Sequence, residues 1–147
     1  MDPKLKVIMV GIGIIILILV SGCVERTQQN DSVNKSSYLF FPTQKESVTS
    51  YMDALFVGSV EVDNNGCLRA GAHLLVWPYN FSPRIDNKTI QIIDDTGKHI
   101  ASVGDYLKIG GGEISDEHVG EYSAQLPCDR CPGPYWIVAP DVQVIQE

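Results

Sequence analysis

The residues of this chain with the most reactive side chains are its four cysteines, Cys23, Cys67, Cys128 and Cys131. Cys128-Asp129-Arg130-Cys131 has the spacing of a thiol oxidoreductase motif, in which the start of a following helix lowers the pKa of the first thiol. Here Pro132-Gly133-Pro134 follows at once, and two prolines around a glycine do not begin such a helix. The pattern therefore favours a structural disulfide and a spare thiol over redox catalysis.

Zinc binding is a second chemistry that these cysteines could support together with His73 or His118, because thiolate and imidazole are the usual ligands of structural zinc. Such sites commonly combine two Cys-x-x-Cys or Cys/His units, and this chain has a single Cys-x-x-Cys. We therefore expect no metal and no cofactor. A thiol redox or zinc-dependent enzyme that uses Cys128 and Cys131 is the alternative.

The other patterns that could indicate catalysis are weaker. Gly110-Gly111-Gly112 lacks the Lys-Ser or Lys-Thr pair of a phosphate loop, and the following Glu113 would repel an anion. A β-bulge is the expected role of these glycines. His73, His99 and His118 lie far apart in the sequence, and none accompanies a recognisable serine nucleophile motif. We therefore predict no catalytic residues and a protein that is not an enzyme.

The first 22 residues have the three zones of an export signal. Lys4 and Lys6 come first, an apolar segment of 14 residues runs from Val7 to Val20, and small residues precede Cys23. As a helix this segment would span about 21 Å, which is less than the ~30 Å of bilayer hydrocarbon. Its length favours a cleaved signal peptide, and an uncleaved N-terminal membrane helix is the alternative.

The run Val20-Ser21-Gly22-Cys23 ends this segment, and it resembles the lipobox of prokaryotic lipoproteins. The resemblance implies that the Cys23 thiol becomes a diacylglyceryl thioether and that residues 1–22 are removed. Two acyl chains hold a protein stably on a bilayer, whereas one chain is marginal. We therefore expect a lipid-anchored protein on the extracytoplasmic face of the cell membrane, acting as a binding or structural module for an unidentified ligand or protein of the cell envelope.

The stretch from Val24 to Ser50 is polar and has neither helical nor strand periodicity, which is typical of a disordered tether. Within it, only Tyr38-Leu39-Phe40-Phe41-Pro42 is apolar enough to pack against a neighbouring domain. We assign residues 1–22 to a signal peptide, 23–50 to a tether and 51–147 to one small domain. The net charge of −7 argues against a nucleic acid partner, because phosphate binding needs a basic surface.

Past Val48 the chain consists of short apolar runs separated by turn residues, a pattern typical of an all-β domain. Two tight hairpins are expected, one at Asn65-Gly66, where both residues suit positive φ angles, and one at residues 94–97. A short helix is expected from Ser115, as its N-cap, to about Ala124. The pattern fits a small, partly closed barrel of the OB or SH3-like kind, or a small sandwich.

Residues 55–138 contain a distinctive set of short motifs: Gly66-Cys67-Leu68-Arg69, Leu75-Val76-Trp77-Pro78, Gly97, Gly104-Asp105, Gly110-Gly111-Gly112-Glu113 and Cys131-Pro132-Gly133-Pro134-Tyr135-Trp136. Together they resemble a small uncharacterised domain of secreted and lipid-anchored prokaryotic proteins, and no activity comes with the resemblance. It implies a Cys67–Cys131 disulfide, since both cysteines lie inside the motifs and Cys128 lies outside them. Such a bridge closes a loop of about 64 residues and contributes roughly 4 kcal/mol by chain entropy. Pairing of Cys128 with Cys67 or with Cys131 is the alternative.

Aromatic residues and sequons indicate what the surface could bind or carry. Trp77 and Trp136 lie in apolar strands and are expected in the core, which leaves Tyr79 and Phe81 as candidates for a ligand surface. Four Asn-x-Ser/Thr sequons occur among six asparagines, more than chance predicts, and would carry glycans if the host glycosylates exported proteins. The sequons start at Asn30, Asn34, Asn80 and Asn87.

Overall fold

The computed structural model describes residues 38–126 and 128–146. Cys23, Asn30 and Asn34, the expected signal peptide and the first part of the expected tether lie outside these residues. The described chain forms eight strands and one short helix, so the expected all-β class is confirmed. The elements are β1 (Ala54–Val62), β2 (Leu68–Ala70), β3 (His73–Val76), β4 (Ser82–Asp86), β5 (Thr89–Ile93), β6 (His99–Ser102), β7 (Tyr106–Ile114), α2 (Val119–Tyr122) and β8 (Tyr135–Ile145).

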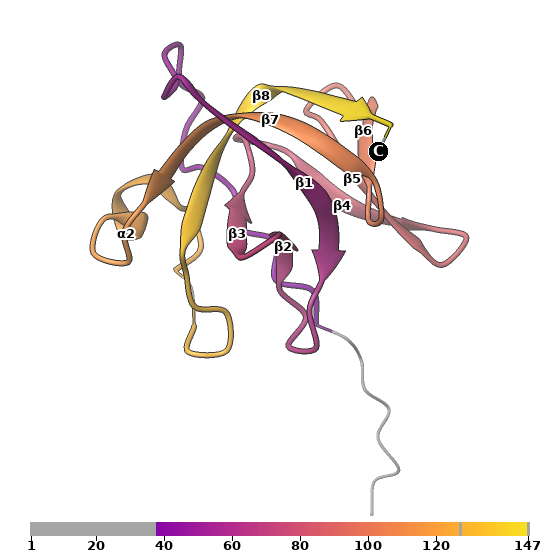
Figure 1. Ribbon diagram of the computed structural model, residues 1–147, viewed down its shortest axis with the longest axis horizontal. Helices are drawn as coiled ribbons and strands as arrows, with labels where there is room; N and C mark the ends of the chain where they lie inside the picture. Colours follow the sequence, from indigo (N-terminus) through magenta and orange to yellow (C-terminus); the bar gives the residue numbers. More distant parts are fainter. Residues whose placement is uncertain (1–37, 127, 147) are drawn as a thin grey trace, which may run out of the picture. The chain divides into compact units, whose positions relative to one another are not determined.

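Five of the strands close a barrel in the order β1-β2-β3-β8-β7, with β7 pairing back onto β1. Figure 1 shows β7 between β1 and β8, its neighbours in this barrel. All pairs are antiparallel except β3 with β8, where Leu75 lies opposite Trp136 in parallel register. Five strands in this order form the Greek-key barrel of the OB kind, one of the small barrels that the sequence predicts.

A second sheet, in the order β4-β5-β6, is inserted between β3 and β7. Ile92 of β5 and Ala101 of β6 are fully buried and join the barrel core, so one face of this sheet covers the barrel. Strand β4 is exposed along its whole length and was not expected from the sequence. Its segment, Ser-Pro-Arg-Ile-Asp, has one large apolar residue and contains a proline, and both features argue against a central strand.

Strand β3 and the first five residues of β8 are buried on both faces, because alternate side chains enter two separate apolar clusters. The cluster inside the barrel includes Leu75, Trp77, Trp136 and Val138. The cluster on the other face includes Leu74, Val76, Tyr135 and Ile137, together with Phe40, Val119, Cys67 and Cys131. Covering this outer face therefore requires segments that lie outside the barrel strands.

The glycine run after Ile109 forms a β-bulge, as the sequence predicts. The register between β7 and its neighbour β8 shifts between Ile109 and Gly111. Gly111 has a φ of 139°, and a Cβ at this position would collide with the carbonyl oxygen of Ile137. Only glycine fits here, since L side chains rarely adopt this conformation and the neighbouring strand approaches too closely.

Residues 38–45, named here the strap, cover the start of β2 and the end of β3. Phe40 N donates to Gly66 O at 2.7 Å, and Trp77 N donates to Pro42 O at 2.8 Å. Phe40, Pro42 and Gln44 are buried. The expected domain boundary at residue 51 is therefore too late, because the folded unit includes residues 38–50, and the one apolar run of the expected tether packs as part of the domain.

Two local details differ from the expectations. Helix α2 begins at Val119 and has only four residues. It ends at Tyr122 because Ser123 is already extended (φ −88°, ψ 132°) and bridges Gln44 of the strap. Ser115 contributes its carbonyl oxygen, which accepts bonds from the His118 and Val119 N–H groups, and it is not the N-cap. In the β1–β2 turn Gly66 has a positive φ of 81°, whereas Asn65 does not.

Candidate ligand-binding groove

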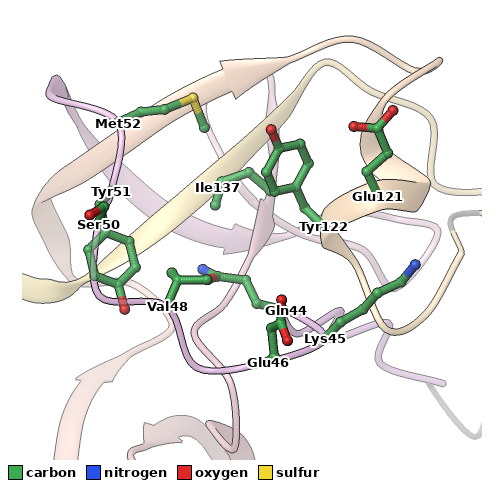
Figure 2. Close-up of a pocket in the computed structure, with 10 residues that line it drawn as sticks. All are labelled: Gln44, Lys45, Glu46, Val48, Ser50, Tyr51, Met52, Glu121, Tyr122 and Ile137. Atoms are coloured by element: carbon green, nitrogen blue, oxygen red, sulfur yellow. The ribbon is translucent and has the colours of Figure 1, made fainter.

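A groove of about 350 Å³ lies between the segment that follows the strap and helix α2. Figure 2 shows Tyr51 and Tyr122 on either side of Gln44 and Ile137. Tyr122 and Met52 remain 43% and 39% exposed, so apolar surface is open to a ligand there. The lining residues are Gln44, Lys45, Glu46, Val48, Ser50, Tyr51, Met52, Glu121, Tyr122 and Ile137.

Hydrogen bonds to residues 122–125 fix the strap side of the groove. Lys45 N donates to Tyr122 O at 2.9 Å, and Ala124 N donates to Thr43 O at 2.7 Å. The buried Gln44 side chain donates through Nε2 to the Val138 carbonyl oxygen of β8 at 2.7 Å. Because each of these bonds joins positions far apart in the sequence, they form only when the whole domain is folded.

The wall made by residues 46–51 carries unused backbone groups. Within the described chain, no backbone hydrogen bond joins these residues to another segment. Val48 and Tyr51 in this wall are only partly buried, and Ser50 is exposed. Free N–H and C=O groups beside exposed apolar side chains are what an extended peptide uses when it binds along a protein edge.

Charge around the groove is predominantly acidic. Glu46 and Glu121 line it, against the single cationic side chain of Lys45. The Lys45 ammonium group donates to the Gly120 carbonyl oxygen and does not pair with a carboxylate. An acidic rim around an apolar floor favours cationic ligands that also carry an apolar group.

The Cys67–Cys131 disulfide is present and joins the β1–β2 turn to the loop between β7 and β8. The two cysteines are fully buried and lie in the outer cluster with Phe40 and Val119. The pairing implied by the sequence resemblance is therefore confirmed, and the two pairings that involve Cys128 are wrong. The bridge holds the loop that carries α2 against the barrel.

Cys128 is an exposed free thiol. The hydrogen bond from the Arg130 backbone N–H is the largest cause of a lowered pKa for this thiol. Desolvation acts in the opposite direction, and the Cys131 backbone N–H lowers the pKa further. Cys131 is occupied by its disulfide with Cys67, so the Cys-x-x-Cys motif does not provide two thiols for redox exchange or zinc. No cluster of three metal-ligating side chains occurs in the described parts of the chain.

The aromatic pair expected to form a ligand surface is split by the fold. Tyr79 is 43% exposed, but Phe81 is buried in the barrel core, with its ring 6.5 Å from that of Trp77. Phe81 is therefore corrected from a surface candidate to a core residue, because the chain turns inward after Asn80. Both tryptophans are buried, as expected.

Tyr51 and Tyr122 of the groove are sites that sequence reasoning missed. The only sequence signal for the wall made by residues 46–51 is that Val48 and Met52 interrupt an otherwise polar stretch.

The three histidines lie apart and contact different partners. His73 contacts Glu113, His99 contacts Ser102 and His118 contacts Glu121. The three histidines therefore do not come together in one cluster within the described residues.

Comparison with known proteins gives no match, since no family model, no curated protein and no solved structure was found to be similar to the chain. Across residues 38–126 and 128–146, no helix is both long and apolar enough to cross a membrane.

Proposed function

We propose that this protein is a membrane-anchored binding module of the cell envelope, and that the groove beside α2 is its binding site. The observation that carries the proposal is the groove itself, an open apolar surface held by a buried polar anchor and long-range hydrogen bonds. A small domain that leaves tyrosine and methionine side chains exposed in a concave site favours ligand binding over a purely structural role.

The ligand class that fits is a polypeptide segment with an apolar side chain next to basic residues. The apolar side chain would contact Tyr122, Met52 and Ile137, while the free backbone groups of residues 46–51 pair with the ligand backbone. The carboxylates of Glu46 and Glu121 would face its cationic groups. The same acidic rim would repel an acidic peptide of equal length.

Methyl NMR of full-length protein in detergent micelles tests this site. Met52 is the only methionine among the described residues, so labelling methionine methyl groups places a reporter inside the groove. The probes are the capped tripeptides Ac-Lys-Leu-Lys-NH2 and Ac-Glu-Leu-Glu-NH2. We expect the basic peptide to shift the Met52 signal in a saturable manner and the acidic peptide to leave it unchanged.

Two variants make the groove test specific. Tyr122→Ala removes the ring from the groove and should weaken the basic peptide at least tenfold, a change of about 1.4 kcal/mol in binding free energy. Tyr79→Ala removes an equally exposed tyrosine outside the groove, and this variant should bind the basic peptide with the affinity of the wild-type protein. An unmoved Met52 signal, or an equal response to both peptides, would contradict the proposed ligand class.

The anchor part of the proposal is supported by the sequence Val20-Ser21-Gly22-Cys23 and by a buried disulfide, which suits an oxidising compartment outside the cytoplasm. Mass spectrometry of protein from the host membrane should find Cys23 as the first residue, carrying two acyl chains. Cys23→Ser should retain Met1 and remain unlipidated. An unchanged protein with intact Met1 that diffuses freely inside the cell would refute the anchor.

A further inference from the structure

Strand β4 is an open sheet edge on the surface of the domain. It pairs with β5 alone, and all five of its residues are exposed. Ile85 is 77% exposed, the highest value among the large apolar side chains of the described chain. An exposed edge strand with an apolar side chain is a template for pairing with another chain, so proteins usually protect such edges.

Two of the four sequons lie at the two ends of this strand. Asn80 stands two residues before β4, and Asn87 follows it directly in the turn to β5. Both asparagines are exposed and have positive φ angles, 64° and 47°. Asparagine is among the few residues that adopt this conformation readily, so the turns account for asparagine but not for the Ser or Thr two positions later.

The two sequons differ in their accessibility. Asn87-Lys88-Thr89 is exposed at all three positions and forms the tip of the β4–β5 hairpin, which Figure 1 shows projecting from the domain. Asn80-Phe81-Ser82 contains a buried phenylalanine, whose ring stacks with Trp77 in the core. A modifying enzyme can therefore bind the Asn87 sequon in the folded protein, whereas the Asn80 sequon is presented fully only before folding.

We propose that Asn87 carries an N-linked glycan and that this glycan covers the open edge of β4. The donor is a lipid-linked oligosaccharide: Asn87 Nδ2 bonds to the anomeric carbon of the sugar, the bond from that carbon to the lipid diphosphate breaks, and the diphosphate leaves with the electron pair. The amide loses one proton in the step, and a base of the modifying enzyme accepts it. A bulky hydrophilic chain at the hairpin tip hinders approach of a second strand. This inference rests on the export that is part of the proposed function.

Peptide mass spectrometry of the protein purified from membranes of its own host tests the modification. We expect the Asn87 peptide to be heavier by one oligosaccharide, and its occupancy to exceed that of Asn80. Asn87→Gln and Thr89→Val should remove the added mass, whereas Thr89→Ser should keep it. An unmodified Asn87 peptide in protein that is lipidated at Cys23 overturns the inference and leaves the proposed function intact, whereas protein that is not exported contradicts both.

Light scattering tests the protective role. Asn87→Gln should associate at a protein concentration severalfold lower than the glycosylated protein does. Adding Ile85→Lys to this variant should restore the monodisperse behaviour, because a charge on the edge opposes strand pairing. If Asn87→Gln stays as monodisperse as the glycosylated protein, the glycan does not protect the edge.

Discussion

The strap side of the domain and the β4 side differ in the contacts that hold their strands in place. On the strap side, contacts that are distant in the sequence cover the second face of β3 and β8: Gln44 bonds to Val138, and Cys67 bonds to Cys131. On the β4 side, the pairing is local, since Asp86 pairs with Thr89 across a short turn. The first region therefore depends on global folding, and the second on turn chemistry.

This difference has a functional consequence. The groove requires side chains from the strap, from α2 and from β8 to stay in register, and long-range links provide that rigidity. The β4 hairpin has no such groove to maintain, and its residues are exposed. Substitutions on the strap side should thus cost much more stability than substitutions in β4, and the predictions below test that contrast in order of expected size.

Removing the disulfide should have one of the two largest effects. Replacing Cys67 and Cys131 together by alanine opens a loop of 64 residues, and loop entropy sets the cost at about 4 kcal/mol of unfolding free energy. Denaturant unfolding of the two-alanine variant measures it. Cys128→Ala is the matched control and should unfold as the unchanged protein does, because its side chain is exposed and unpaired. Equal stability of both variants would mean that the bridge does not hold the outer cluster together.

Phe40→Ala should have an effect of similar size, about 3 to 5 kcal/mol, because Phe40 is 6% exposed and fills the outer cluster. Ile85→Ala in β4 is its counterpart, and it should change the unfolding free energy by less than about 0.5 kcal/mol. Both values come from the same denaturant titrations. If the Phe40→Ala variant is as stable as Ile85→Ala, the strap does not stabilise the domain and acts only as a tether.

The sequence predicted best those parts of the fold that local residues determine. The Asp94–Gly97 turn and the glycine bulge at Gly111 require backbone conformations that few residues adopt. The sequence therefore predicts both the kind of feature and its position. The two tryptophans were placed correctly in the core by their apolar neighbours. Strand β4 was missed because an exposed edge strand needs no apolar pattern.

The groove could not be predicted for a different reason. Gln44 and Ser123 are adjacent in the structure but 79 positions apart in the sequence, and nothing in a polar stretch marks which residue will be buried. Gln44 is buried because Val138 offers it a carbonyl oxygen, which is a property of the assembled fold. Phe81 was misplaced for the same reason, since the turn at Asn80 decides which way its ring points.

The smallest predicted effect compares two aspartates with the same local role. Asp63 Oδ1 accepts bonds from the N–H groups of Asn65 and Cys67, and Asp94 Oδ1 accepts bonds from those of Thr96 and Lys98. Only Asp63 also bonds to a guanidinium, that of Arg69, whose Nη2 reaches the Pro132 carbonyl oxygen beside the disulfide. Asp63 therefore links a local turn to the long-range network, whereas Asp94 stabilises its turn alone.

Stability measured against pH separates these two roles. Partial burial raises the pKa of Asp63, but the bonds from Cys67, Arg69 and Asn65 outweigh it and leave the pKa below its usual value. For Asp94 the bond from the Thr96 hydroxyl is the main cause of a lowered pKa. A carboxyl group whose pKa falls on folding stabilises the protein above its unfolded pKa of about 3.9, and this contribution disappears as the pH falls through the folded value.

Asp63→Asn should therefore cost about 1 kcal/mol at pH 7, where the charge-assisted bond to Arg69 is intact, and the difference from the unchanged protein should shrink below about pH 4. Asp94→Asn should show the same pH trend with a smaller amplitude, because its exposed carboxylate has no guanidinium hydrogen bond and the Lys98 charge is the weakest cause of its lowered pKa. Denaturant titrations at pH 7, 5 and 3 measure both. If the two variants lose equal stability at pH 7, the Arg69 link adds nothing to the local turn, and the contrast between the two regions rests on the disulfide and Phe40 alone.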